Sequence, residues 1–268
     1  MIASQLIFAL SFVPFLATAA PVSVPVSSEE LHVLSRRGFG YNGVTTATST
    51  AWYTDNFSKG PSTPASGYQC YHGDVSKYPT KDKWMNFYDL FNHNKPAMLA
   101  RNNGNGELVG EIWNAIVKVS QDAKVDARVI LATVMQESTG QANVPCTGTM
   151  PNCGLMQASY GSISFNPADS QGSITEMIRE GVQGTNSGGP YGGGGPGLVQ
   201  FLNNVLSWVT NPWPGNPYAA ARMYNSGHIS NNNLDDLTGS EWSTKSYAND
   251  IANRLLGWDG SGAGFAAC

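Results

Sequence analysis

Apolar side chains recur at helical spacing through the middle and the end of this chain. Trp84, Phe87, Tyr88 and Phe91 lie three or four residues apart, which predicts a helix from about Lys81 whose aromatic face packs in the core. A second apolar stripe predicts a helix over 107–123. The other predicted helices run from a cap at Asp126 to Glu137 and over 173–184, 197–209, 217–224 and 241–256.

The segments between these helices are long and rich in turn-forming residues. Residues 139–152 are expected to form a loop, and 154–157 to begin another ordered segment. The glycines of 186–196 predict a flexible surface loop or a lip over a cleft. Strands do not alternate with helices, so the fold class is expected to be mainly α with long loops.

The chain before the first helix divides into three segments of different composition. Residues 1–20 have the apolar core and small-residue end of a signal peptide, which predicts a secreted protein. Residues 21–37 end in Arg36-Arg37 and resemble a pro-segment with a dibasic processing site, although an exposed basic pair is the alternative. Residues 38–80 are rich in Ser, Thr and Gly and predict an irregular linker or mobile arm. The catalytic domain is expected over 81–268.

Asn56 is a candidate for glycosylation. It begins the triplet Asn56-Phe57-Ser58, which has the pattern of an N-glycosylation acceptor in an exported protein. The sequon lies in the segment 38–80, where an exposed side chain is expected.

Composition excludes several classes of partner. Charged residues are 13% of the chain and the net charge is -4, without a basic cluster, so we expect no nucleic-acid partner. After the signal peptide no apolar run reaches about 18 residues, and no membrane partner is expected. Abundant Gly, Asn, Ser, Thr, Trp and Tyr suit an extracellular surface that faces carbohydrate. We expect a monomer.

Four cysteines predict an oxidised framework in an exported chain. Three pairings are formally possible. The spacing favours Cys146 with Cys153, which closes a small loop and leaves Cys70 to tether the C-terminal Cys268.

No residue pattern indicates a metal or a cofactor. The cysteines lack paired Cys-x-x-Cys spacing, and His72, His93 and His228 are scattered along the chain. We therefore expect no metal ligands, and no cofactor-binding motif is present.

Glu137 has the environment of a general acid for cleaving a glycosidic bond. Its neighbours on the helical face are Ile130, Thr133 and Val134, and a carboxyl among apolar side chains has a raised pKa. Such a group stays protonated until it donates to the leaving oxygen. The alternative is an ordinary glutamate near a helix C-terminus, where the helix dipole disfavours an anion.

Three motifs follow one another in the second half of the chain. They are Glu137-Ser138-Thr139-Gly140, Gly154-Leu155-Met156-Gln157 and Met223-Tyr224-Asn225-Ser226-Gly227. The set resembles the soluble lytic transglycosylases and goose-type lysozymes of glycoside hydrolase family 23. In that family a Glu-Ser pair ends a helix, a Gly-Leu-Met-Gln run lines the cleft and an Ala-Tyr-Asn-Ala-Gly run packs nearby. The resemblance covers about 107–256.

The resemblance implies a lysozyme-like transglycosylase (SLT) domain that cleaves the β-1,4 bond between N-acetylmuramic acid and N-acetylglucosamine in peptidoglycan. Glu137 would be the catalytic acid and base. The implied substrate-binding residues are Ser138, Gly154, Leu155, Met156, Gln157, Tyr224 and Asn225.

Residue type suggests a role for several of these positions. Gln157 can offer its amide to sugar hydroxyls or an N-acetyl group, Tyr224 can hydrogen-bond near the acid, and Asn225 can fix the turn. Met156 forms the cleft floor or fills the core. Ser138 contacts the acid or substrate, or bonds to backbone at the helix end.

The absence of a second carboxylate near Glu137 favours the transglycosylase branch. Hydrolytic glycosidases usually pair two carboxyl groups, and no Asp or Glu lies between Glu137 and Tyr160, where Ser159 stands two residues past the Gln of the second motif. Asp169 and Glu176 remain possible partners from a later segment. In a transglycosylase the substrate's own N-acetyl or 6-hydroxyl group replaces the missing residue and water.

Other functions on the same fold remain open. A hydrolytic muramidase or a chitinase would use the same acid, and a non-catalytic glycan-binding or cell-wall-associated protein would keep the fold alone. A serine hydrolase is excluded because Gly161-Ser162-Ile163-Ser164 lacks the Gly-x-Ser-x-Gly pattern.

Overall fold

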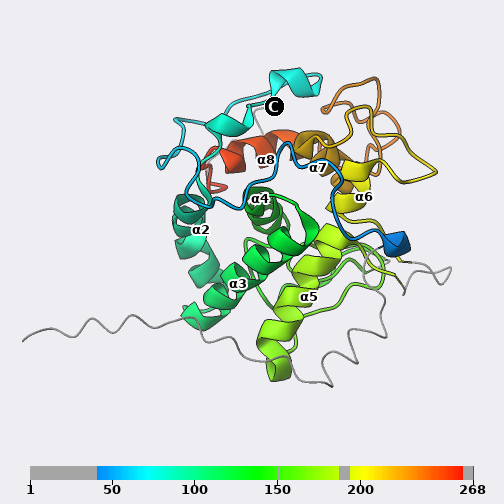
Figure 1. Cartoon of the computed structure of the whole chain (residues 1–268). Helices are drawn as coiled ribbons and strands as arrows, with labels where there is room; N and C mark the ends of the chain where they lie inside the picture. Colours follow the sequence, from blue (N-terminus) through cyan, green and yellow to red (C-terminus); the bar gives the residue numbers. More distant parts are fainter. Residues whose placement is uncertain (1–40, 150, 187–193, 262–267) are drawn as a thin grey trace, which may run out of the picture.

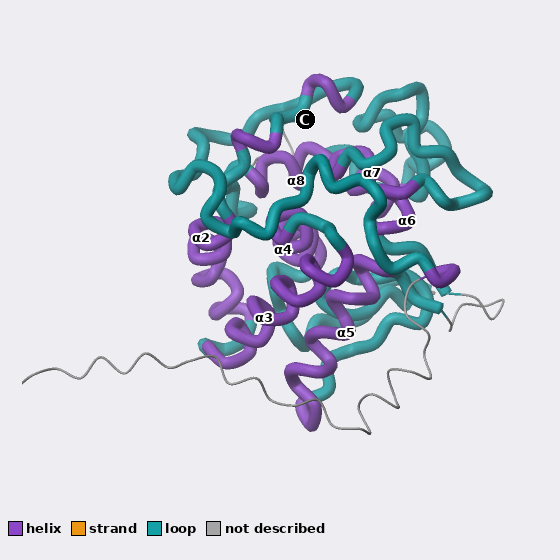
Figure 2. The backbone as a smooth tube through the Cα atoms, in the orientation of Figure 1, coloured by secondary structure: helices purple, strands orange, loops and turns teal. Residues whose placement is uncertain are grey.

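The structure, a computed structural model, describes residues 41–149, 151–186, 194–261 and 268. The expected signal peptide, the expected pro-segment and most of the glycine-rich loop lie outside these residues. Within the described ranges the regular structure is almost entirely helical, and strand pairing is limited to isolated bridges such as Thr147 with Asn152 (Figure 2). The expectation of a mainly α fold is confirmed.

Helix α4, Ala127–Glu137, lies at the centre of the molecule. Its sequence is mainly apolar, and residues 127–135 are all buried, as expected for a helix that other elements surround. Figure 1 shows α4 end-on in the middle of the other helices. It contacts four of them, α2 (Phe87–Arg101), α3 (Gly106–Ala123), α5 (Ser170–Gln183) and α8 (Tyr247–Leu255).

Helix α2 begins later than the aromatic spacing predicts. Trp84 has extended backbone angles and precedes the helix, because Asn86 caps it and accepts a hydrogen bond from the Asp89 amide at 3.0 Å. The placement of Trp84 on the helical face is therefore wrong. The expectation of core packing holds for Trp84, Phe87 and Phe91, which are buried, but not for Tyr88, which is 45% exposed.

Of the last three helices, α6 (Leu198–Asn203) and α8 (Tyr247–Leu255) are shorter than predicted, whereas the third starts at the predicted residue and runs two residues further. Helix α6 ends early because Asn204 adopts a left-handed conformation, with φ of 53°. Helix α7 is Pro217–Ser226. Helix α8 starts after a series of turns. In these turns the carbonyl oxygen of Thr244 accepts a hydrogen bond from buried Arg222 at 2.9 Å.

Residues 41–80 have little regular structure, but they pack on the helices, and the expectation of a mobile arm is wrong for them. The rings of Trp52 and Trp84 stack 5.2 Å apart, and those of Phe57 and Phe87 lie 5.3 Å apart. Asn253 of α8 holds the backbone of Gln69 on both sides, at 2.8 Å each. Aromatic rings within a polar composition account for this docking.

Both expected disulfides are present. Cys146 pairs with Cys153, and Cys70 pairs with Cys268, 198 residues away. In the chain-entropy account a closed loop of that length stabilises the fold by about 5 kcal/mol. Among the described residues no helix is long and apolar enough to cross a membrane.

A buried ion pair fixes the start of α4. Arg128 donates from Nε and Nη2 to the two carboxylate oxygens of Asp126 at 2.8 and 2.9 Å, and both side chains are 2% exposed. The guanidinium also lies 4.9 Å from the Trp84 ring, and its Nη1 donates to the carbonyl of Lys59 at 3.2 Å. The pair therefore joins α4 to residues 41–80.

Replacing Arg128 with Leu should lower the free energy of unfolding by roughly 3–5 kcal/mol, because it leaves the Asp126 carboxylate buried without its partner. Chemical denaturation monitored by circular dichroism measures this. Lys118→Ala is the control, since the Lys118–Asp122 pair is largely exposed and should matter by less than about 1 kcal/mol. Equal losses in the two variants would contradict the role of the buried pair.

Candidate active site

Glu137 is the last residue of α4, where the buried helix reaches the surface of the molecule. Helical geometry stops at Ser138, with φ of -135°, and Thr139 is left-handed, with φ of 54°. The carboxyl therefore projects from the end of a helix whose residues 127–135 are buried, and the side chain remains only partly exposed.

Tyr247, the first residue of α8, holds the Glu137 carboxyl. Its buried hydroxyl donates to Glu137 Oε1 at 2.5 Å. Burial raises the pKa of Glu137 to about 7, while the Tyr247 hydrogen bond and the charge of Arg254 oppose that rise. Burial and the nearby Glu137 charge raise the pKa of Tyr247, so the phenol stays a neutral donor. The carboxyl is thus oriented and able to exchange a proton near neutral pH.

The structure brings the three sequence motifs together next to Glu137. The Ser138 hydroxyl lies 2.8 Å from the carbonyl oxygen of Leu155, and the Tyr224 hydroxyl donates to the carbonyl oxygen of Met156 at 2.8 Å. The charge of Glu137 also contributes to a raised pKa of Tyr224, after desolvation. Segments separated by up to 87 positions in the sequence therefore form one cluster.

Ser138 and Tyr224 bond to backbone in this cluster. Ser138 Oγ also lies 3.0 Å from the Val134 carbonyl and accepts from the Gly140 amide at 3.2 Å. Of the two roles left open for Ser138, the structure shows the backbone role. Tyr224 lies near the acid, as expected, but its hydrogen bond goes to the second motif.

Two glycines allow the second motif to lie so close to its neighbours. Gly154 has φ of 76°, and a Cβ there would come within 2.9 Å of the Ile163 carbonyl oxygen. A Cβ on Gly181 of α5 would come within 2.5 Å of the Met156 side chain. Leu155 and Met156 are fully buried, so their side chains belong to the core and anchor the turn.

Gln157 stabilises the loop that the Cys146–Cys153 disulfide closes. Its Oε1 accepts from the Thr147 hydroxyl at 2.7 Å, and its Nε2 donates to the carbonyls of Gly154 and Pro145 at 3.1 and 3.3 Å. The amide that sequence analysis assigns to sugar recognition is therefore engaged within the protein. Its contact with a sugar stays a prediction.

Asn225 joins the end of α7 to the segment before α8. Its Oδ1 accepts from the Thr244 amide at 2.9 Å. Gly227 follows as the left-handed cap of α7, and its amide donates to the Met223 carbonyl at 2.7 Å. Asn225 thus has a positional role at the turn, as its residue type suggests.

The later carboxylates considered as partners for Glu137 have other contacts. Asp169 caps α5 through the Gly172 amide at 3.2 Å, and Glu176 pairs with Arg179 at 2.8 Å. Glu180, which sequence analysis does not single out, is buried, and its charge helps to raise the pKa of Tyr224. Its Oε2 accepts from the Ile163 amide at 2.8 Å, which holds the chain after the second motif.

Behind Glu137 lies a polar network that the sequence does not reveal. The neighbouring Gln136 accepts from Arg254 Nε at 2.8 Å and donates to Asp250 at 3.1 Å. Asp250 in turn accepts from the Tyr68 hydroxyl at 2.6 Å. These contacts join the end of α4 to α8 and to residue 68.

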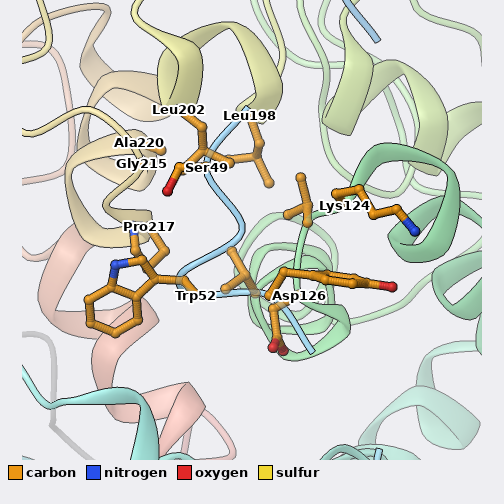
Figure 3. A pocket seen from close by; sticks show the side chains of 12 residues that line it. Ser49, Trp52, Lys124, Asp126, Leu198, Leu202, Gly215, Pro217 and Ala220 are labelled. Carbon is orange, nitrogen blue, oxygen red and sulfur yellow. The ribbon is translucent and has the colours of Figure 1, made fainter. Parts of the chain in front are cut away.

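A cavity of about 20 Å³ lies at the opposite end of α4, between residues 49–53, α6 and α7 (Figure 3). Asp126, the cap at the start of α4, lines it, and the 11 residues of the helix separate Asp126 from Glu137 by about 16 Å. The cavity has room for about one water molecule. Its position and size separate it from the Glu137 cluster.

Two of the three histidines named above have separate hydrogen-bond partners. His72 Nδ1 lies 3.1 Å from Asp235, and His228 Nε2 lies 3.0 Å from the Thr238 carbonyl. In the part of the chain that the structure describes, no three His, Cys, Asp or Glu side chains could together hold a metal ion.

No family model, curated protein or solved structure matches the chain. The resemblance to glycoside hydrolase family 23 therefore stays a prediction that rests on the three sequence motifs.

Glu137→Gln should stabilise the protein at pH 8 by up to about 3 kcal/mol and have little effect at pH 4. The folded pKa of about 7 exceeds the ordinary value of 4.5, so the free energy of unfolding falls as the pH rises between these values. The neutral amide escapes this cost. Denaturation curves at several pH values measure the difference, and a constant offset at every pH would contradict the burial of the charge.

Tyr247→Phe should raise the pKa of Glu137 further, because it removes the hydrogen bond that favours the carboxylate. The titration of the Glu137 side-chain carboxyl carbon by NMR measures this. Tyr53→Phe is the control, since Tyr53 lines the cavity at the other end of α4 and should leave the midpoint in place. An unchanged or lower midpoint in Tyr247→Phe would exclude the assigned hydrogen bond.

Proposed function

We propose that this protein is a secreted lytic transglycosylase that cleaves the β-1,4 bond between N-acetylmuramic acid and N-acetylglucosamine in peptidoglycan. The observation that carries the proposal is the convergence of the three motifs on a desolvated carboxyl. The Ser138–Leu155 and Tyr224–Met156 contacts join them, and the hydroxyl of Tyr247 holds Glu137.

Glu137 has the properties that the first step requires. A pKa of about 7 leaves a large fraction of the carboxyl protonated in mildly acidic or neutral solution, and its proton passes to the glycosidic oxygen as the C–O bond breaks. The carboxylate that remains stays hydrogen-bonded to Tyr247, which lowers the cost of its charge.

The second step follows from the contacts of the other carboxylates. A hydrolase needs a base or nucleophile facing the acid, whereas Asp169, Glu176 and Glu180 bond to their own backbone or salt-bridge partners. We therefore assign the base role to Glu137 itself. The carboxylate takes the proton of the 6-hydroxyl as that oxygen attacks the anomeric carbon, which closes a 1,6-anhydro ring without adding water.

The secreted location rests on the signal-peptide pattern of residues 1–20. Two disulfides and the absence of a membrane-spanning helix among the described residues are compatible with it. A peptidoglycan-cleaving enzyme also needs access to cell walls outside the cell that produces it, which this location provides.

Digestion of purified peptidoglycan should yield muramic ends that are one water lighter than hydrolysed ends, as measured by mass spectrometry. Glu137→Gln should lower the rate by roughly 10³-fold or more, because it removes the proposed proton donor. The rate should also fall as the pH rises above about 7, when Glu137 loses its proton. Hydrated ends alone would identify a hydrolase instead, and full activity in Glu137→Gln would reject the site.

A further inference from the structure

Two exposed tryptophans near the end of α7 have no role in the Glu137 cluster. Trp208 is 58% exposed and Trp242 is 75% exposed. These are the two most exposed large apolar side chains among the described residues. A single apolar residue on a surface is ordinary, so their placement decides whether they have a function.

Both tryptophans are connected to one short segment, residues 225–227: Trp208 directly, and Trp242 through its near neighbour in the chain, Thr244. The Trp208 ring lies 4.0 Å from where a Cβ on Gly227 would be. Trp242 stands two residues before Thr244, whose amide donates to Asn225 at 2.9 Å. The loops that carry them, 204–216 and 228–246, leave α6 and α7 on the same side of the molecule, in yellow to orange in Figure 1.

Residues 225–227 continue directly from the candidate active site. Residue 225 follows Tyr224, whose hydroxyl bonds to Met156 and whose pKa is raised in part by the charge of Glu137. A polymer that reaches Glu137 along the end of α7 therefore passes residues 225–227. The Trp208 ring and the segment that carries Trp242 therefore lie next to such a path.

The segment 227–246, which carries Trp242, is mostly polar or acidic. Ser230 donates to the Thr238 carbonyl at 2.7 Å, Asn231 donates to Asp236 at 2.7 Å, and the stretch 227–246 contains one lysine and no arginine. A protein interface would need a contiguous apolar core of larger area, and an anionic membrane surface would need basic residues. A sugar ring has apolar C–H faces and hydroxyl edges, and this surface offers partners for both.

We propose that Trp208 and Trp242 are stacking positions for sugar units of a β-1,4-linked, N-acetylated aminosugar chain, on the α7 side of Glu137. The proposal deepens the proposed function and rests on it for the identity of the ligand. The indoles bind units away from the cleaved bond, so they act on retention of the polymer and not on the proton transfer.

Binding is tested in the Glu137→Gln background, so that the glycan stays intact. Sedimentation with insoluble peptidoglycan should show roughly five- to tenfold weaker retention for Trp208→Ala and for Trp242→Ala, and a larger loss for the double variant. Parallel sedimentation with chitin distinguishes the two sources of the sugar chain. Thermal unfolding verifies that the variants fold, as expected because the Trp208 and Trp242 side chains are exposed.

Tyr88→Ala provides the matched control. Tyr88 is 45% exposed at the start of α2, where its ring stacks on Trp113. The end of α2 contacts the segment after Glu137, through Asn102 and Gly140, so the start of α2 lies away from the site. Retention should equal that of the parent. Unchanged binding in the double tryptophan variant, or an equal loss in Tyr88→Ala, would overturn the proposal.

Activity measured in the protein that retains Glu137 separates this inference from the proposed function. The tryptophan variants should have a raised KM on long glycan chains, with kcat on tetrasaccharides unchanged. If the unmutated protein cleaves no glycan but the tryptophan substitutions weaken glycan binding, the proposed function fails and the inference stands. If the unmutated protein cleaves glycan and the tryptophan variants have the same KM on long chains, only the inference fails.

Discussion

The helix that ends at Glu137 loses contact with water only because other elements cover all of its sides. Four helices and the irregular residues 41–80 provide that cover, and the Asp126–Arg128 pair closes its starting end. Desolvation of the last carboxyl follows from the same packing that forms the core. The chemistry proposed for Glu137 and the stability of the fold therefore depend on one arrangement.

At the end of α4, the burial that raises the pKa of Glu137 also lowers the stability of the fold when that carboxyl is charged. An anion at a helix C-terminus meets an unfavourable dipole, and burial adds to its cost. The Tyr247 hydroxyl, the charge of Arg254 and the bonds of Gln136 limit that cost without removing it. Functional sites commonly keep such unfavourable groups because activity depends on them.

Sequence periodicity and cap residues predicted the central helices closely, because Asp126 and the apolar run of α4 leave few alternatives. The cysteine pairing followed from spacing alone. Tyr247 was missed because its partner is 110 positions away and no local pattern reports such a contact. The docking of 41–80 was missed for the opposite reason: Trp52 and Phe57 were visible, but the Ser and Thr around them dominated the composition.

The Cys70–Cys268 bridge has a consequence for how the protein responds to proteases. It joins residue 70 to residue 268, so the body of the protein between them is a covalent ring. A protease that cuts once within this ring opens it but releases no fragment, because the two new ends remain connected through the sulfur atoms. The most exposed turns, including those that carry Trp208 and Trp242, could be nicked while the helices around α4 stay assembled.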